Sequence, residues 1–152
     1  MASTIDNATL TITVNEDVKL NGYQVGSKIV QTIGAINEAS RRVMTVATSE
    51  VSILTLSTSS IGGGYISSNV QYIRVSNLDD TNFVRLSFLS GSGGAGNRYD
   101  MKLPAKRTAI FTSPSMSGSN VGSTFNSFSD FDTMKATADT AAVDIELFVA
   151  ST

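Results

Sequence analysis

Apolar side chains alternate with polar ones in a series of short runs, and this alternation limits the fold more than any other feature of the sequence. The longest stretch covers residues 70–89, where Ile73 and Val75 alternate with more polar neighbours and a second run leads from Phe83 to Phe88. A period of two is typical of strands with one buried face. Residues 77–82 separate the runs and are rich in Asn and Asp, which favour a turn. We therefore predict a central β-hairpin over residues 70–89.

A second hairpin is predicted near the N-terminus. Leu10, Ile12 and Val14 alternate with threonines, which indicates a strand with one half-buried face. Asn21-Gly22 is a strong signal for a two-residue hairpin turn, because both residue types tolerate a positive φ.

The whole pattern predicts an all-β fold. Roughly eight to ten short runs recur at a spacing of about 8 to 12 residues, which is typical of a sandwich or barrel. The last run, residues 143–149, alternates most clearly. A chain of 152 residues is long enough for one domain with its own core. We predict an antiparallel β-sandwich, jelly-roll-like, with residues 1–8 as an N-terminal arm and residues 9–152 as a single sandwich domain.

The composition argues against several classes of function. Histidine and cysteine are absent, which removes thiolate nucleophiles, the usual zinc ligands and the Ser-His-Asp and Cys-His forms of catalysis. The net charge is −2, and the basic residues are scattered apart from Arg41-Arg42, so there is no basic footprint for nucleic acid. The N-terminus lacks the pattern of a Sec signal peptide, and no run is apolar enough for a membrane helix. We expect no enzyme, no cofactor, no bound metal, and neither a nucleic acid nor a membrane as partner.

Three polar or glycine-rich patterns have structural explanations that we favour. The glycine-rich residues 90–97 precede a strand, whereas a phosphate-binding loop must open a helix. The acidic turn at residues 77–82 lacks the glycine and distal glutamate of an EF-hand. Carboxylates stand two residues apart in two places, Asp130 with Asp132 and Asp144 with Glu146. Such pairs are more typical of a solvated strand face than of a glycosidase.

Five large apolar residues are candidates for contacts with other subunits. They are Tyr65, Ile66, Phe125, Phe128 and Phe148. Phe125 and Phe128 lie within a tract of Ser, Gly and Asn that is too long for a simple connection. For Tyr65, Ile66 and Phe148, a position in the core with a shifted register is an equally weighted alternative.

Three stretches resemble a recurring layout in small virion proteins of tailed bacteriophages, particularly marine and cyanobacterial phages. They are YIRVSNLDDTNFVRLSF, KLPAKRTAIF and FDTMKATADTAAVDIELFVA. The shared layout has a strand ending in Ser-Asn-Leu-Asp, a strand with Val-Arg-Leu, a proline turn and a terminal strand after Ala-Asp-Thr-Ala. The similarity covers roughly the second half of the chain, and Ala105 stands where a glycine usually follows the proline.

The resemblance implies a β-sandwich building block of a bacteriophage virion, such as a capsid decoration or cement protein. Such a protein binds the shell by burying surface. Its partners would be the major capsid protein or other virion proteins, and it would be made in the host cytoplasm without a signal peptide. We expect a homo-oligomer, with a trimer favoured. The alternative is a tail or fibre module that recognises a host surface glycan, and a lysis enzyme is the least favoured hypothesis.

Overall fold

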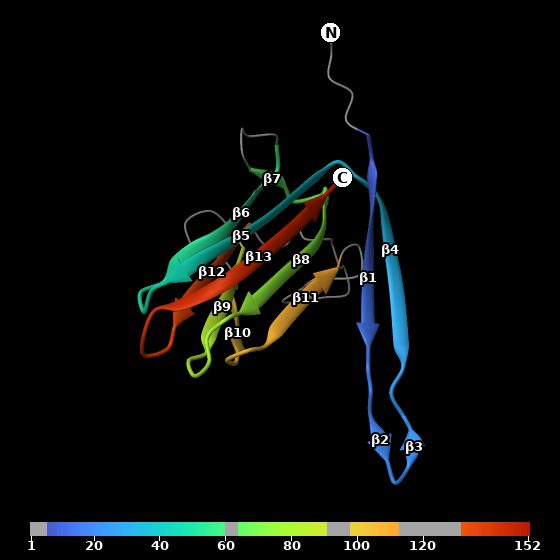
Figure 1. Ribbon diagram of the computed structural model, residues 1–152. Coiled ribbons are helices and arrows are strands. Elements are labelled where there is room, and N and C mark those ends of the chain that lie inside the picture. Colours follow the sequence, from blue (N-terminus) through green and yellow to red (C-terminus); the bar gives the residue numbers. More distant parts are fainter. Residues whose placement is uncertain (1–5, 60–63, 91–97, 113–131) are drawn as a thin grey trace. The chain divides into compact units, whose positions relative to one another are not determined.

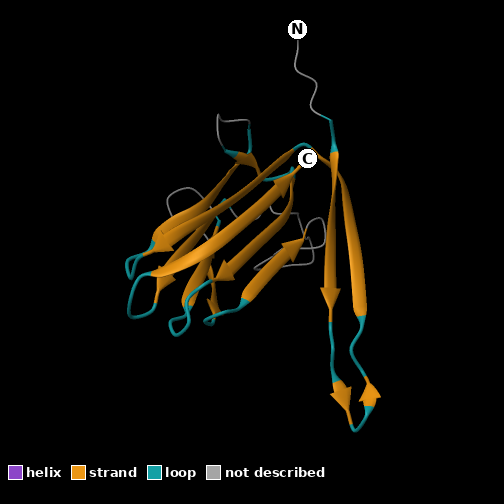
Figure 2. Cartoon of the chain, in the orientation of Figure 1, coloured by secondary structure: helices purple, strands orange, loops and turns teal. Residues whose placement is uncertain are grey.

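The computed structural model describes residues 6–59, 64–90, 98–112 and 132–152 (Figure 1). Every regular element in these ranges is a β-strand (Figure 2). The chain divides into two compact units, Met1–Asn37 and Glu38–Thr152. Among the described strands, the first four pair only with one another. The predicted arm of residues 1–8 and single domain of residues 9–152 stay a prediction. Residues 1–5 of the predicted arm lie outside the described ranges.

The first unit is a long antiparallel hairpin. Its strands are β1 (Ala8–Asn15), β2 (Lys19–Leu20), β3 (Tyr23–Gln24) and β4 (Lys28–Ile36). β1 pairs with β4, and β2 pairs with β3. Asn21 and Gly22 have φ angles of 50° and 85°, as a two-residue turn of type I′ requires. The hairpin turn predicted at these two residues is confirmed.

The second unit is a sandwich of two sheets. Its strands are β5 (Glu38–Val46), β6 (Val51–Ser57), β7 (Tyr65–Ile66), β8 (Val70–Asn77), β9 (Val84–Leu89), β10 (Arg98–Leu103), β11 (Thr108–Thr112), β12 (Thr133–Ala138) and β13 (Val143–Ser151). One sheet has the order β10-β9-β12-β6-β7 and the other β11-β8-β13-β5. Only the short β6–β7 pairing is parallel among the described strands. The predicted antiparallel β-sandwich is therefore confirmed.

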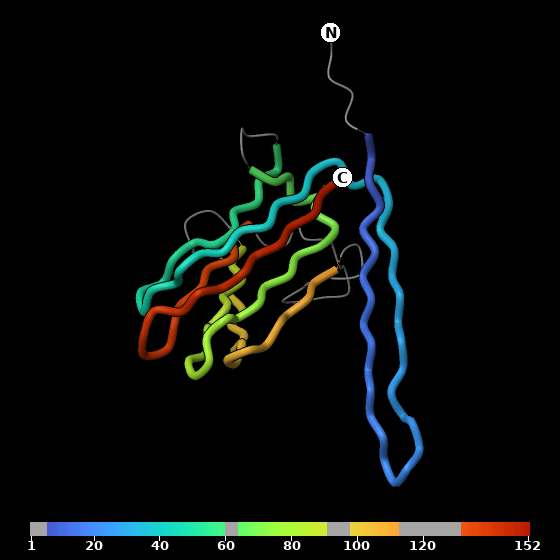
Figure 3. The backbone as a smooth tube through the Cα atoms, in the orientation of Figure 1, coloured from blue at the N-terminus to red at the C-terminus, as the bar shows by residue number. Residues whose placement is uncertain are grey.

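Strands from the two halves of this unit pair in a nested order. β5 pairs with β13, β6 with β12, β8 with β11, and β9 with β10. The chain therefore passes repeatedly from one sheet to the other, as the backbone trace in Figure 3 shows. A nested order of this kind favours the jelly-roll-like connectivity expected from the sequence.

The central hairpin predicted over residues 70–89 is wrong. β8 lies between β11 and β13 in one sheet, whereas β9 lies between β10 and β12 in the other. The turn itself forms as predicted, since the Asp79 carboxylate accepts hydrogen bonds from the backbone N–H groups of Thr81 (2.7 Å) and Asn82 (2.6 Å). Alternation specifies which face of a strand is buried but not which strand is its neighbour, so the turn connects two sheets.

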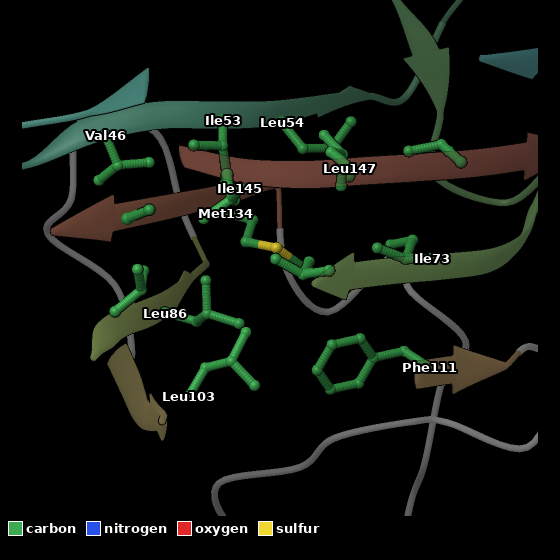
Figure 4. Packing of buried hydrophobic residues seen from close by; sticks show 14 of the residues in the cluster. Val46, Ile53, Leu54, Ile73, Leu86, Leu103, Phe111, Met134, Ile145 and Leu147 are labelled. Carbon is green, nitrogen blue, oxygen red and sulfur yellow. The ribbon is translucent and has the colours of Figure 1, made fainter. Parts of the chain in front are cut away.

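The hydrophobic core lies between the two sheets. Ile73, Leu86, Met134 and Ile145 come from both sheets and are fully buried (Figure 4). Along β13 the predicted alternation holds, because Ile145 and its neighbours two residues away belong to the core while the residues between them face outward. The core cluster contains no described residue of the hairpin unit.

Candidate assembly surfaces

Tyr65 fills the core of the single chain. It belongs to the core cluster, and its hydroxyl donates a hydrogen bond to the Ser40 Oγ atom on β5 at 2.6 Å. This placement agrees with the core alternative that the sequence left open for Tyr65. Ile66, the next residue of β7, is half-buried. An interface role for either residue stays a prediction.

Phe148 lies on the outward face of β13, as the alternation predicts, and is half-buried. Its ring meets the ring of Tyr72 edge-on at a centroid distance of 5.7 Å, and the Arg74 guanidinium lies 6.0 Å from its centroid. These contacts bind Phe148 to neighbours on β8. Phe125 and Phe128 lie outside the described residues, as do Asp130 and most of the glycine-rich stretch.

Glu146 is the centre of an ion-pair network on the same outward face. Its side chain is 9% exposed, and it pairs with Arg41 on β5 at 2.5 Å and with Arg74 on β8. The hydrogen bond from Arg41 lowers the pKa of Glu146, and the charge of Arg74 adds to this effect against the opposing effect of burial. Asp144 accepts a hydrogen bond from the Thr45 hydroxyl at 2.6 Å. Glu146 is therefore a partnered, buried carboxylate and not the solvated one expected from the sequence.

The outward face of the other sheet also carries charge. Glu50 pairs with Arg98 at 2.7 Å and with Lys135 at 3.1 Å. The hydrogen bond from Arg98 holds the pKa of Glu50 below its ordinary value. Arg98 pairs in turn with Asp100 at 2.8 Å. Both outward faces of the sandwich are thus crossed by internal ion pairs, and neither presents a continuous apolar surface among the residues described.

The hairpin unit has one apolar face. Residues that pair across two strands lie on the same side of a ribbon, and the register pairs Leu10 with Ile33 and Val14 with Ile29. At the tip, Leu20 pairs with Tyr23. The same register continues between them, because the backbone N–H of Val25 donates to the Val18 carbonyl at 2.9 Å. The apolar hairpin face therefore consists of Leu10, Ile12, Val14, Val18, Leu20, Tyr23, Val25, Ile29 and Ile33.

Much of the apolar hairpin face is accessible to solvent. Val14 is 41% exposed, Ile29 57% and Tyr23 78%, whereas Leu10, Ile12 and Ile33 are half-buried. The opposite side of the ribbon is polar apart from Val30, since its cross-strand pairs include Thr11 with Thr32 and Asn15 with Lys28. The hairpin is thus an amphipathic two-stranded ribbon.

Sequence reasoning predicted a strand with one half-buried face at Leu10, Ile12 and Val14 and included it in the sandwich domain of residues 9–152. The strand is confirmed, yet none of these three residues belongs to the core cluster. The overlooked signal is the symmetry about Asn21-Gly22. Alternation continues at the same register on both sides of this turn, which indicates that the two strands share one apolar side but does not indicate what covers it.

Comparisons with known proteins identify no family. The chain matches no model of a protein family and no curated protein. Among solved structures it is similar to a protein of the disulfide-linked pili that form Bacillus endospore appendages, with 18% sequence identity and a TM-score of 0.48. That similarity covers 76% of this chain and 85% of the other. A likeness this distant says nothing about function.

Two further observations concern chemistry and membranes. Within the described ranges, no three His, Cys, Asp or Glu residues are grouped so that they could hold a metal ion. The same ranges contain no helix long and apolar enough to cross a membrane.

Proposed function

We propose that this protein is a structural component of a bacteriophage virion, a capsid decoration or cement protein that binds the shell by burying surface. The single observation that carries the proposal is the apolar hairpin face. Exposed apolar patches of this extent on soluble proteins typically mark sites of protein contact. A protein whose task is to cover neighbours needs such a surface together with a rigid body to present it.

The sandwich supports this proposal as the rigid body. Its core is continuous between two sheets, and ion pairs such as Glu146 with Arg41 and Glu50 with Arg98 cross its outward faces. These carboxylates are occupied in holding neighbouring strands together. Their arrangement suits a scaffold better than a reaction centre, in which an acid and a base converge on a substrate.

The proposed partners are further copies of this chain, with a trimer favoured, and the major capsid protein or other virion proteins. The proposed location of the protein is the virion.

The glycan-binding alternative has weaker support from the described residues. A sugar site needs exposed aromatic rings beside polar groups. Tyr72 and Phe148 form the one aromatic pair on the outward face of their sheet among the described residues, but Tyr72 is buried and Arg74 lies against Phe148. The faces of these two rings are therefore largely occupied, whereas the exposed ring of Tyr99, whose centroid lies 6.2 Å from that of Phe88, is the aromatic group of the described sandwich that the alternative could use.

The test is a binding experiment with the full chain. Purified protein is mixed with isolated shells and, separately, with tails of the phage that encodes it, and pelleted protein is measured against concentration. Saturable binding to shells is the expected result. Binding to tails or to host cell-wall sugars alone would favour the alternative, and binding to none of these would contradict the proposal.

A further inference from the structure

We propose that the apolar hairpin face packs against the apolar hairpin face of a second copy of this chain. The inference rests on the proposed assembly role, and it assigns the apolar hairpin face to the contact between copies, so that the shell would be bound through other surfaces. A contact of one face with the same face on another copy joins chains in pairs, and a trimer would need a further contact. Two ribbons stacked in this way would form a small two-layer structure with a shared apolar interior and two polar outer sides.

The apolar side of the ribbon needs a packing partner. An isolated two-stranded hairpin is at best marginally stable in water, whereas three or more strands with a hydrophobic face, or packing against a helix, give independent stability. β1 and β4 pair only with each other, and β2 and β3 pair only with each other, among the described strands. The stability of this unit therefore depends on a partner that packs against its apolar side.

The exposed apolar area of the hairpin is large enough for a contact between two copies. Six residues of the apolar hairpin face are among the exposed large hydrophobic residues: Val14, Val18, Leu20, Tyr23, Val25 and Ile29. At about half exposure they leave apolar surface on the order of 500 Å² per chain. Face-to-face contact of two copies would bury about 1,000 Å² in total, which reaches the lower limit for a specific interface.

The exposed hydrophobic residues of the sandwich are scattered. Outside the hairpin, the described residues expose four large hydrophobic side chains: Val43, Leu78, Tyr99 and Ile110. They lie on three different strands and one turn, and the charged Arg74 and Glu146 stand between Val43 and Ile110 in the register of their sheet. No surface of the described sandwich thus matches the apolar hairpin face in extent. The surface of this chain that does match it is the same face on another copy.

The geometry of the ribbon suits this contact. Face-to-face sheets pack about 10 Å apart with interdigitating side chains of medium size, and the apolar hairpin face contains mainly Val, Leu and Ile. Lys19 and Lys28 belong to the opposite side by register and would stay in water. By register, the polar residues Glu16, Ser27 and Gln31 lie on the apolar side as well. The Glu16 carboxylate accepts a hydrogen bond from the Ser27 hydroxyl at 3.0 Å.

Two adjacent residues provide a matched pair of variants. Ile29 lies on the apolar hairpin face and is 57% exposed, while Val30 lies on the polar side and is 55% exposed. Ile29→Asp should raise the dissociation constant for self-association of the full chain at least 10-fold, measured by sedimentation equilibrium. Val30→Asp introduces the same charge at the neighbouring position and should change that constant less than 3-fold.

Crosslinking tests the contact directly and does not depend on whether an Asp variant folds. Since the sequence contains no cysteine, a single one can be introduced without competition. Val14→Cys should crosslink between chains with a short bismaleimide, whereas Thr13→Cys, on the other side of β1, should not.

The outcomes separate this inference from the proposed function. Self-association that Ile29→Asp abolishes and Val30→Asp spares supports the inference, whether or not the protein binds shells. A chain that stays monomeric up to about 100 μM, equal effects of the two Asp variants, or equal crosslinking at residues 13 and 14 would overturn it. If such a monomer still binds shells, the inference fails while the proposed function stands. The apolar hairpin face would then pack against the shell or against another part of its own chain.

Discussion

At the scale of single residues, the hairpin depends on a glycine at a point of close approach. A Cβ atom added to Gly26 would lie 1.9 Å from the Glu16 carbonyl oxygen, which is a backbone atom and cannot rotate away. A Cβ atom added to Gly34, in the same unit, would meet no atom within 4 Å. The two glycines therefore differ in what a methyl group would contact.

We predict that Gly26→Ala opens the hairpin locally while Gly34→Ala does not. Overpacking of this kind costs about 1–3 kcal/mol, equivalent to a change of about fivefold to 150-fold in an opening equilibrium. Hydrogen exchange at the Glu16 and Val25 amides, which donate to Ser27 and Val18, should accelerate by that factor in the Gly26 variant. Equal acceleration in the Gly34 variant would contradict the prediction.

At the scale of elements, side chains join strands that the backbone already pairs. Glu146 on β13 holds arginines from β5 and β8, one on either side of it. A glutamate with a lowered folded-state pKa stabilises the fold fully above its ordinary pKa of 4.5. That contribution is lost as the pH falls below 4.5 through the folded-state pKa.

We predict that Glu146→Gln destabilises the sandwich by about 1–2 kcal/mol at pH 7, since a charge-assisted bond is lost while the exposed Arg41 is screened by water. The difference from the wild-type protein should shrink at pH 3. Urea unfolding at both pH values measures it. Asp144→Asn removes the same charge from the same face without breaking an ion pair, so a similar loss in that variant would argue against the proposed cause.

The sequence predicted the positions of strands better than their neighbours. Alternation located the strand of residues 143–149, and Asn21-Gly22 located its turn, because both signals are local. The pairing of β8 with β13 and of β9 with β12 joins residues far apart in the chain, and the period of two contains no information about such pairing.

The candidate site was predicted only in part. Leu10, Ile12 and Val14 were correctly placed in a strand, but alternation does not tell a core-facing side from an uncovered one.

At the scale of the whole molecule, the chain is two compact units whose boundary follows Asn37. The core cluster is built from residues between Val46 and Val149. We predict that residues 38–152 fold alone, with a midpoint of thermal unfolding within about 5 °C of the full chain, and that they fail to self-associate. Circular dichroism and light scattering test the two parts. A fragment that melts much earlier would show that the sandwich depends on the hairpin, and one that still self-associates would place the contact between copies elsewhere.

The junction at Asn37 has a mechanical consequence. β4 ends at Ile36 and β5 begins at Glu38, so Asn37 alone connects the two strands. A connection of one residue can extend very little under tension. A pull on the hairpin would reach the first residue of β5 at once, where Glu38 is in register with Ser151 near the end of the chain. The hydrogen bonds between β5 and β13 would then resist the force. This pair of strands would therefore transmit the load to the sandwich.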